Sequence, residues 1–586
     1  MPTRGLRSTP RVRNSCGAPA DGLPTIVTMT LDLTDRRPWL RHYDPWVTPD
    51  LTAPPQPLAT LLDETAAETP DLPATEFLGA SLTWQAVKHR ADALASWMAT
   101  AGVSHGDRIG ILLPNCPQYL ITTFAVLRLG GVVVNINPAY TPREVAAMAQ
   151  DAGLSACVTL DTRAAQVTAA AAVTPLRWVV VTALGDYAEP CDPCPPPTDA
   201  WRATAPQVVC WHDAQAPFAP PAVEVAPEDL AVLQYSGGTT GAPRAAMLTH
   251  ANIHANVMQT AMFFERPQPR GGRCYLLVIP CAHVYGFTVG LLRGTWLAAR
   301  LVLLPAFDPE GLLDAVRRFR PTYIPAVPSV FHALLAQPEE RRAPLADVGQ
   351  CNSGGAPASL ALFEAWEAAT GRPLNQGYGL SECSPVTHSM PHTGPRHPGT
   401  IGVPLSGTDM KIVDADTGTR TLPVGEVGEL CICGPQVMRG YWRRPQESAA
   451  AVRTDADGRR WLYTGDLARL DGDGFTTIVQ RKKDVILVDG FTVYPAEIED
   501  VLASHPSVAQ AAVVGLPDAQ RGERIVAVIV PTSTVDPDLA ALDALCREAL
   551  ARFKRPSEYH VRDTLPTSAA GKRLYRVLRD ELSARP

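Results

Sequence analysis

Charged residues are scarce in this sequence. Asp, Glu, Lys and Arg make up 19% of its 586 residues, and the formal net charge is -7. A protein whose main partner is nucleic acid needs a broad basic surface, and this balance does not predict one. Hydrophobic residues reach 46%, which is ordinary for a globular protein. The length exceeds what a single hydrophobic core serves, so we expect two or more domains.

Paired cysteines and long apolar runs are also missing. Among the thirteen cysteines, Cys191 and Cys194 form the one Cys-x-x-Cys pair, and no second pair completes a zinc site. Scattered thiols are typical of reduced, cytoplasmic proteins. Two uncharged stretches, 111–127 and 274–292, both contain proline, so we interpret them as buried strand–turn–helix units and not as membrane spans. Peripheral contact with a membrane and the oligomeric state stay open.

The first residues lack the apolar core of a secretory signal. Up to about position 28, arginines stand among prolines and glycines. We expect residues 1–45 to be a disordered extension, and the alternative is that Met29 is the true start.

Short apolar runs alternate with helix-like segments through the middle of the chain. The sequence predicts strands at 109–113, 132–135, 156–160, 276–279, 301–304 and 323–326, and helices at 58–69, 81–102, 117–129 and 141–152. Such alternation builds right-handed βαβ units around parallel sheets. The proline-rich segment 191–221 is interpreted as a surface loop. The predicted fold class is therefore α/β.

The texture changes twice towards the C-terminus. From Lys411, short strands and glycine turns indicate a small β-rich subdomain, still within a large domain 46–480. From Arg481, strands at 486–488, 509–514 and 525–530 and helices at 496–503 and 538–550 indicate a last module, 481–586. Its length of about a hundred residues suits a separate small α+β domain.

A glycine-rich stretch at 234–252 reads QYSGGTTGAPRAAMLTHAN. It opens on an apolar run, turns through Ser236, Gly237, Gly238, Thr239, Thr240 and Gly241, and ends in a helix-like segment. Glycines let a backbone approach a ligand closely, and hydroxyls with bare N–H groups suit phosphate oxygens. The stretch is not the GxxxxGK[ST] phosphate loop, so an ordinary glycine-rich turn is the alternative.

Four further stretches carry chemistry in a fixed order. They are SGGAP at 353–357, NQGYGLSE at 375–382, YTGD at 463–466 and QRKKD at 480–484. Together with the glycine loop they resemble the adenylate-forming superfamily, and most of all bacterial long-chain fatty acyl-CoA synthetases. The resemblance extends from about residue 40 and includes NQGYGLSECSPV, GPQVMRGYW, YTGDLA and QRKKDVILVDGFTVYPAEIEDV.

The resemblance implies a large N-terminal domain and a small C-terminal domain that rotates over it as a lid. It implies that ATP and a fatty acid give acyl-AMP and pyrophosphate, and that the thiol of CoA then displaces AMP. ATP and CoA are the implied co-substrates, and Mg²⁺ is the implied cofactor. Loading of a carrier protein, and medium-chain or aromatic acids, are the alternatives.

Residue roles follow from the same resemblance. Residues 236–241 would hold the phosphates, while Thr239 and Glu382 would hold Mg²⁺. Tyr378 would stack on adenine, and Asp466 would accept hydrogen bonds from the ribose hydroxyls, with Arg481 nearby. The other implied ATP-binding residues are Gly355, Ala356, Pro357, Gln376, Gly377, Gly379 and Ser381.

Five further residues belong to the implied acyl and thiol chemistry. Lys572 would stabilise the charge that builds during adenylation. Lys483 would be the hinge, and Gly490 would leave room for the pantetheine thiol. His283 and Phe287 would line the acyl tunnel, although a buried core histidine is a strong alternative for His283.

One departure from the family pattern concerns the glycine loop. The loop usually continues with Lys-Gly, whereas this chain has Arg244 and Ala245. Arginine keeps the charge but presents it differently. Ala245 would be strained if its backbone needed a positive φ.

Replacing Lys572 by Ala is expected to abolish acyl-AMP formation and to spare thioester formation from supplied acyl-AMP. The matched variant Gly490→Leu is expected to do the reverse, because a side chain there blocks the thiol. Separate assays of the two half-reactions check this, and equal loss of both in either variant contradicts the assignment.

Overall fold

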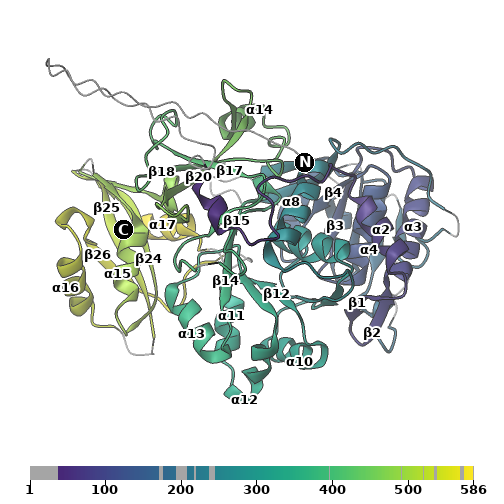
Figure 1. Ribbon diagram of the computed structural model, residues 1–586, viewed down its shortest axis with the longest axis horizontal. Coiled ribbons are helices and arrows are strands. Elements are labelled where there is room, and N and C mark those ends of the chain that lie inside the picture. Colours follow the sequence, from purple (N-terminus) through teal and green to yellow (C-terminus); the bar gives the residue numbers. More distant parts are fainter. Residues whose placement is uncertain are drawn as a thin grey trace, which may run out of the picture.

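The structure is a computed structural model. It describes residues 37–170, 174, 176–192, 207–216, 219–236, 244–394, 396–489, 491–518, 520–532, 537–567 and 573–584. Two large sheets form the body of the molecule, and a smaller module carries the C-terminus (Figure 1). Of the expected disordered extension 1–45, residues 1–36 lie outside the described residues. The prediction is wrong for residues 37–45, because η1 (Pro38–His42) forms there and Trp39 and Asp44 are buried against the rest of the chain.

The first large sheet has the strand order β7-β6-β5-β3-β4-β8-β9 in the described part. Its neighbours are parallel except for β8 and β9, which pair antiparallel. The strands are β3 (Arg108–Leu112), β4 (Val132–Asn135), β5 (Ala156–Leu160), β6 (Trp178–Thr182), β7 (Val208–Cys210), β8 (Leu230–Ser236) and β9 (Arg244–Thr249).

The second large sheet has the order β16-β15-β14-β13-β12-β10-β11-β1-β2. Its central strands β10 to β14 are parallel, so their carboxyl ends share one edge. The strands are β1 (Pro73–Phe77), β2 (Ala80–Thr83), β10 (Cys274–Leu277), β11 (Arg300–Leu303), β12 (Tyr323–Ala326), β13 (Gln350–Ser353), β14 (Leu374–Gly379), β15 (Val386–Ser389) and β16 (Val403–Pro404).

Helices cover and separate the two sheets. The α4 helix (Pro117–Arg128) is buried at every residue except its last, and α8 (His250–Phe264) is buried along most of its length. The others in this body are η1 (Pro38–His42), α2 (Ala59–Glu68), α3 (Trp84–Thr100), α5 (Pro142–Ala152), η2 (Asp161–Arg163), α6 (Ala164–Ala170), η3 (Leu184–Tyr187), the π-helix η4 (Tyr285–Leu292), α9 (Arg293–Trp296), α10 (Pro309–Phe319), α11 (Pro328–Leu335), α12 (Glu339–Arg342), η5 (Ala343–Asp347), α13 (Leu360–Thr370) and η6 (Ser381–Cys383).

The ends of α5 show how local sequence sets an element. The Thr141 hydroxyl accepts the Glu144 N–H, and the Glu144 carboxylate accepts the Thr141 N–H at 2.8 Å, which is a capping box. Gly153 ends the helix with a φ of 63°, a left-handed conformation that glycine adopts without steric cost.

A five-stranded antiparallel sheet follows, in the order β17-β18-β20-β19 with β21 on β20. Its strands are β17 (Asp409–Val413), β18 (Val427–Cys433), β19 (Val452–Thr454), β20 (Arg460–Leu470) and β21 (Thr476–Arg481), and α14 (Pro445–Ala451) lies in its longest connection. This is the predicted β-rich subdomain.

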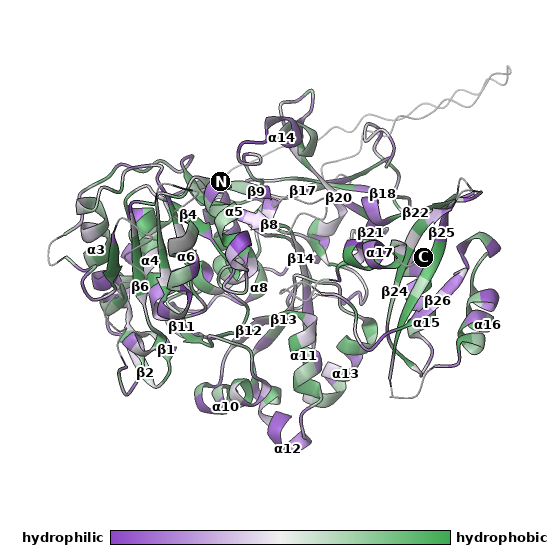
Figure 2. Cartoon of the chain, turned by 180° about the vertical axis from the view of Figure 1, so that it is seen from behind, coloured by the Kyte–Doolittle hydropathy of each residue, from purple (hydrophilic) through white to green (hydrophobic). Residues whose placement is uncertain are grey.

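The C-terminal module has its own sheet, β23-β22-β25-β24 with β26 on β25. In Figure 2, β24 and β25 are hydrophobic over much of their length, whereas α16 shows hydrophilic residues. The elements are η7 (Lys482–Asp484), β22 (Ile486–Val488), β23 (Phe491–Val493), α15 (Pro495–Ala503), β24 (Val508–Asp518), β25 (Gly522–Pro531), α16 (Leu539–Ala549), η8 (Arg552–Lys554), β26 (Glu558–Val561) and α17 (Tyr575–Ser583).

Most predicted elements are confirmed within a few residues, and two interpretations are wrong. The segment after the glycine loop begins as the strand β9, because it pairs with β8 before α8 starts at His250. The supposed surface loop 191–221 contains β7, which extends the first sheet beside β6. Ala245 lies in β9 and does not have a positive φ, so the backbone strain considered for this alanine is absent.

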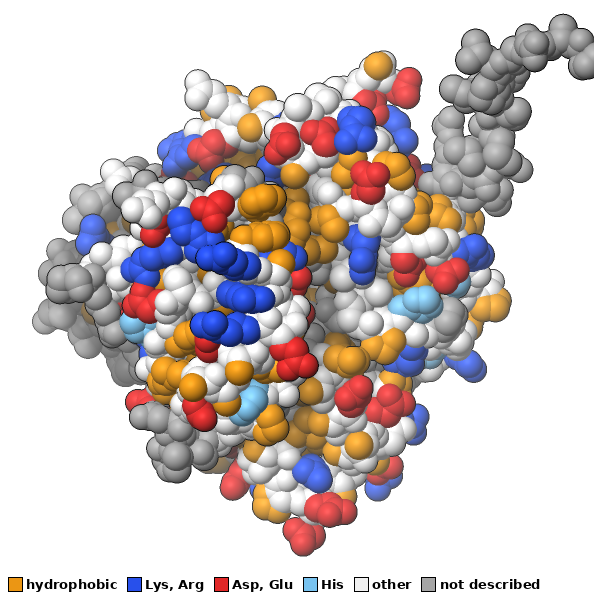
Figure 3. All heavy atoms as spheres, turned by 90° about the vertical axis from the view of Figure 1, so that its left-hand side faces the viewer, with side chains coloured by type: hydrophobic (Ala, Val, Ile, Leu, Met, Phe, Trp, Pro, Cys, Tyr) orange, Lys and Arg blue, Asp and Glu red, His pale blue; other side chains and the backbone are white. Residues whose placement is uncertain are grey.

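The two uncharged stretches form buried strand–turn–helix units, as predicted. Among the helices of the described residues, none combines the length and apolar character needed to cross a bilayer. On the side that the C-terminal module occupies, Lys and Arg side chains gather in a patch, and others lie scattered among acidic and uncharged side chains (Figure 3).

We expect residues 481–586 to fold alone, because two buried apolar clusters consist only of residues from this module. A fragment 481–586 should show one cooperative thermal transition by circular dichroism. A fragment 491–586 lacks Ile486 and Val488, which are fully buried, and should unfold at a lower temperature. Absence of a cooperative transition in the longer fragment contradicts an independent module.

Candidate active site

Several predicted site residues meet at the carboxyl edge of the second large sheet. The SGGAP stretch follows β13, and residues 380–382 follow β14, which is the parallel neighbour of β13. Ligands of open α/β sheets bind in the crevice at this edge, so the position itself indicates a site. Gly355 has a φ of 80°, a conformation that the turn after β13 requires and that favours glycine.

A second glycine is required by close packing. A Cβ on Gly379 would lie 2.3 Å from the carbonyl oxygen of Pro385, because β14 turns back there to pair with β15. The hairpin fixes the position of Tyr378 opposite His388. The GYG sequence therefore places an aromatic ring beside bare backbone.

The Asp466 carboxylate is the centre of the charged part of the site. Its side chain is 3% exposed, and Oδ1 lies 2.7 Å from Nε of Arg481 in an ion pair. The Tyr378 hydroxyl donates to Oδ2 at 2.5 Å. Burial, together with the neighbouring carboxylate, raises the pKa of Tyr378 well above its ordinary value, so the hydroxyl stays a donor. Both carboxylate oxygens thus accept hydrogen bonds from the protein. Ribose hydroxyls would either bond to the same oxygens in addition or replace these donors.

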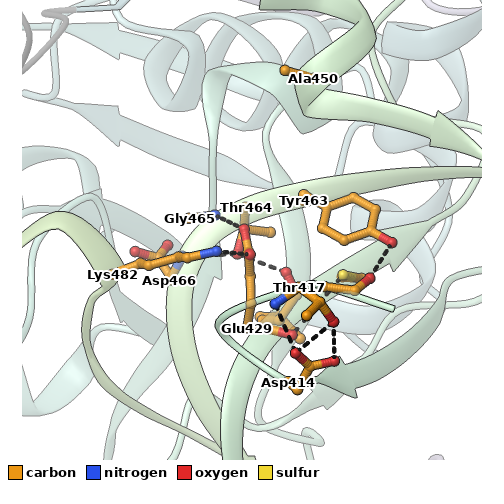
Figure 4. A network of polar contacts seen from close by, with 12 residues as sticks. Asp414, Thr417, Glu429, Ala450, Tyr463, Thr464, Gly465, Asp466 and Lys482 are labelled. Atoms are coloured by element: carbon orange, nitrogen blue, oxygen red, sulfur yellow. Dashed lines mark hydrogen bonds and ion pairs between the residues drawn. The ribbon is translucent and has the colours of Figure 1, made fainter. Parts of the chain in front are cut away.

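A second carboxylate holds β20 at Gly465, just before Asp466. Asp466 was expected in a turn, but it lies within β20, which continues past the positive φ of Gly465. Glu429 on β18 accepts the Gly465 N–H at 3.1 Å and pairs with the Lys482 ammonium at 2.8 Å (Figure 4). Asp466 and Arg481 are direct partners across β20 and β21. The first residues of the C-terminal module are therefore tied to the site by two ion pairs side by side.

Glu382, the implied Mg²⁺ ligand, has partners that the sequence analysis did not assign. The Tyr441 hydroxyl donates to its Oε1 at 2.8 Å, and its backbone oxygen accepts the Met438 N–H at 2.8 Å. Residues 438–442 run antiparallel along β9, and the Trp442 N–H donates to the Ala245 oxygen. The strand that leaves the glycine loop is thereby joined to Glu382. Tyr441 lies in GPQVMRGYW, and that motif was the available signal.

Arg244, which stands where the family loop has lysine, belongs to the same network. Its guanidinium lies 5.5 Å from the centroid of the Tyr441 ring and forms an ion pair at 3.0 Å with Glu447 on α14. Arginine suits this place because its planar group both stacks on a ring and pairs with a carboxylate.

A cavity between these loops and η4 collects the predicted residues only in part. It is lined by Phe264, His283, Val284, Tyr285, Asn352, Gly354, Gly355, Gly377, Tyr378, Gly379, Leu380, Ser381, Pro385 and Val386. Phe264, Tyr285 and Asn352 were missed by the sequence analysis. Ala356, Pro357, Gln376 and Glu382 lie in the adjoining loops and strand but do not line it.

Other predicted residues lie apart from the cavity or outside the described chain. Phe287 is buried inside η4 and does not line the cavity, and Lys483 lies in η7 beside Arg481. Ser236 ends β8, but its side chain is not described. Gly237, Gly238, Thr239, Thr240, Gly241, Gly490 and Lys572 lie outside the described residues.

The Glu382 carboxylate is a suitable ligand for Mg²⁺, a cation that binds oxygen atoms. Mg²⁺ prefers oxygen ligands and is usually bound through one or two carboxylates together with substrate phosphates. Glu382 offers a carboxylate whose Oε1 is oriented by Tyr441. In the described residues, no group of three or more His, Cys, Asp or Glu side chains could hold a metal. A resident all-protein metal cage is thus absent from this part of the chain.

The family comparison agrees with this geometry. The model of the AMP-binding enzyme family matches residues 62–442, and the model of the AMP-binding enzyme C-terminal domain matches residues 497–572. The chain belongs to the AMP-binding enzyme family, the adenylate-forming enzymes.

Individual relatives match over nearly their whole length. The chain is 36% identical to a long-chain-fatty-acid–CoA ligase of Bacillus subtilis (strain 168), covering 94% of this chain and 99% of the relative. It is 32% identical to 4-coumarate–CoA ligase 2 of Oryza sativa subsp. japonica, covering 92% and 94%. ATP-bound MatB from Rhodopseudomonas palustris superposes with a TM-score of 0.77 at 28% identity, covering 90% and 99%.

Replacing Tyr441 by Phe should weaken the Mg²⁺ response, because it removes the donor that orients Glu382 and leaves the ring under Arg244. We expect about a tenfold rise in the Mg²⁺ concentration that half-saturates acid-dependent pyrophosphate exchange, as for other residues that orient metal ligands. Calorimetric titration of MgATP should show the same weakening.

The matched control is Tyr463→Phe, which removes a hydroxyl that donates to the Gly418 oxygen at 2.9 Å, away from Glu382. An equal Mg²⁺ shift in both variants, or none in Tyr441→Phe, contradicts the orienting role.

Proposed function

We propose that this protein is an ATP-dependent acid–thiol ligase that converts a fatty acid into its CoA thioester. The acid oxygen attacks the α-phosphorus of ATP, which forms acyl-AMP and expels pyrophosphate. The sulfur of CoA then attacks the acyl carbon, which forms the thioester, expels AMP and releases the thiol proton. The observation that carries the proposal is the buried Asp466, joined to Arg481 and Tyr378 at the carboxyl edge of the sheet.

Asp466 and its partners would receive the ribose. A carboxylate accepts hydrogen bonds on both oxygens, which suits two neighbouring hydroxyls. The Arg481 cation supports the carboxylate in its charged form, and in this proposal it would also reach the ribose or the phosphates. The bare backbone at Gly355 and Gly377 leaves room for a flat base beside Tyr378.

Glu382, with Thr239, would hold Mg²⁺, which neutralises the charge of the triphosphate when bound. Residues 236–241 would contact the phosphates. In this proposal Arg244 does not take over the phosphate-binding part of the family lysine, because its guanidinium is paired with Glu447 and stacked on Tyr441. Arg244 would instead fix the start of β9, the strand that follows the glycine loop, through its contacts with Glu447 and Tyr441.

The C-terminal module, 481–586, would act as the mobile lid on the large domain 46–480. Lys483 would be the hinge, next to the ion pairs of Arg481 and Lys482. Lys572 would reach the reacting carboxylate during adenylation, and Gly490 would adjoin the path of the CoA thiol. The cations of both pairs are partly exposed, whereas the carboxylates of Asp466 and Glu429 are buried, so rotation of the lid would have to keep or replace these partners.

The acid has two candidates. Relatives named long-chain-fatty-acid–CoA ligases favour a long-chain fatty acid. A medium-chain or aromatic acid is the second candidate, favoured by the aromatic side chains of Phe264 and Tyr285 in the cavity wall and by the relative named 4-coumarate–CoA ligase.

A panel of aliphatic acids of graded length and of aromatic acids, with ATP, Mg²⁺ and CoA, tests the proposal. We expect AMP release and a thioester of the matching mass for at least one acid, and neither without acid. Acyl-AMP that accumulates with CoA present, and thioester formed only on a carrier protein, would contradict the use of free CoA.

A further inference from the structure

A cluster of buried charges lies directly behind the cavity. Glu265, the residue that follows α8, forms ion pairs with Arg293 of α9 and with Arg273, the latter at 2.5 Å. The Tyr275 hydroxyl donates to the same carboxylate at 2.6 Å. The Arg293 side chain is 0% exposed. The proposed chemistry uses none of these groups.

The cluster holds one more cation than anion. Burial alone would raise the pKa of Glu265, but Arg293, Tyr275 and Arg273 together hold it below its ordinary value. The carboxylate is therefore charged, and two guanidinium groups share it. Since isolated buried charges are expensive, the second cation needs another source of stabilisation.

Aromatic rings supply that stabilisation to Arg293. Its guanidinium carbon lies 4.4 Å from the ring centroid of Tyr323 and 5.0 Å from those of Phe264 and Tyr275. In the described residues, Nε and Nη1 of Arg293 have no hydrogen-bond partner. Contacts of a cation with ring faces are favourable and stronger when desolvated. The Arg293 guanidinium is thus packed among three aromatic rings and forms its ion pair with Glu265.

One of these three rings, that of Phe264, also forms part of the cavity wall. Phe264 lines the cavity, and its ring also contacts the Arg293 guanidinium and stacks on Tyr323. The next wall residue, Tyr285, is fixed as well. The Tyr285 hydroxyl donates to the backbone oxygen of Asn352 at 3.2 Å, and a Cβ on Gly354 would lie 3.1 Å from the Tyr285 ring. Neither wall residue can retreat without disturbing the buried charges or the turn after β13.

The remaining wall at this end is polar. Asn352 is buried and lines the cavity, and its Oδ1 accepts the Gln350 amide at 2.7 Å, whereas Nδ2 has no partner among the described residues. A methylene chain running past this amide could not supply the acceptor that Nδ2 lacks, whereas a polar group could. The route past Asn352 therefore does not suit a long hydrocarbon tail.

We infer that Arg293, held by Glu265, is a specificity-determining residue that closes the tail end of the acyl cavity and restricts the acid to a medium-length chain. This inference rests on the proposed function and decides between its candidate acids. Arg293 acts through Phe264 and does not touch the reacting atoms.

The test compares kcat/KM for decanoate and palmitate on the same preparation, because the ratio does not depend on the folded fraction. The wild-type chain should favour decanoate by at least about tenfold, the scale of discrimination that a closed apolar pocket gives. Arg293→Ala removes the support behind Phe264, so the ratio should move towards palmitate by about tenfold. Glu265 keeps Arg273 and Tyr275 as partners in that variant.

Arg273→Ala is the matched control. It removes the other guanidinium from the same carboxylate, and Arg273 has no stacking contact with Phe264 among the described residues. Its decanoate-to-palmitate ratio should equal that of the wild type. If Arg293→Ala does not fold, Phe264→Ala opens the wall from the cavity side and should produce the same shift.

Three results overturn the inference: a wild-type preference for palmitate, an unchanged ratio in a folded Arg293→Ala, or an equal shift in Arg273→Ala. In each of these cases the enzyme is active, but its preference between decanoate and palmitate differs from the one we predict. Failure of the proposed function is different, since no acid in the panel would then give AMP and a thioester.

Discussion

The ion pair between Asp466 and Arg481 is the interaction on which the rest of the site depends. It joins neighbouring strands of the β-rich subdomain, and through the Tyr378 hydroxyl it also holds the loop edge of the second large sheet. The same arginine begins the C-terminal module. One buried carboxylate thus connects three parts of the chain: the second large sheet, the β-rich subdomain and the start of the C-terminal module. Glu429 adds support, since it accepts the N–H of Gly465, the residue before Asp466, and pairs with Lys482, the residue after Arg481.

A second buried carboxylate, Glu265, is used in a contrasting way. Asp466 is bonded to Tyr378, which lines the cavity, whereas both oxygens of Glu265 are taken by Arg273, Arg293 and Tyr275 behind it. Burying a charge is costly unless partners compensate it, so each carboxylate has at least one guanidinium. In our proposals, the first arrangement would bind the ribose hydroxyls and the second would shape the wall of the acyl cavity. The Tyr441 contact with Glu382 adds a third carboxylate whose orientation is set by a tyrosine hydroxyl.

Local patterns were sufficient for most elements and for the order of the motifs. The capping residues of α5 and the apolar runs of β4, β5 and β12 predicted those elements almost to the residue, because their signals are local. The strand β9 was missed because its pairing with β8 depends on a hairpin and not on its own alternation. Tyr441, Phe264 and Arg293 could not be assigned, since their roles arise from contacts between segments far apart in the chain. Phe287 was expected at the cavity, but the π-helical winding of η4 leaves it inside the core.

The most direct test of the central claim is acid-dependent exchange of labelled pyrophosphate into ATP, compared between the wild-type chain and Asp466→Asn. The substitution keeps the shape but replaces a charged acceptor by an amide, so Arg481 loses its partner and the ribose hydroxyls lose one acceptor. The account predicts exchange that requires the acid in the wild type, and a loss of about tenfold or more in the variant, since hydrogen bonds to charged groups contribute about 1.5–3 kcal/mol. Exchange without any acid, or undiminished exchange in Asp466→Asn, would contradict it.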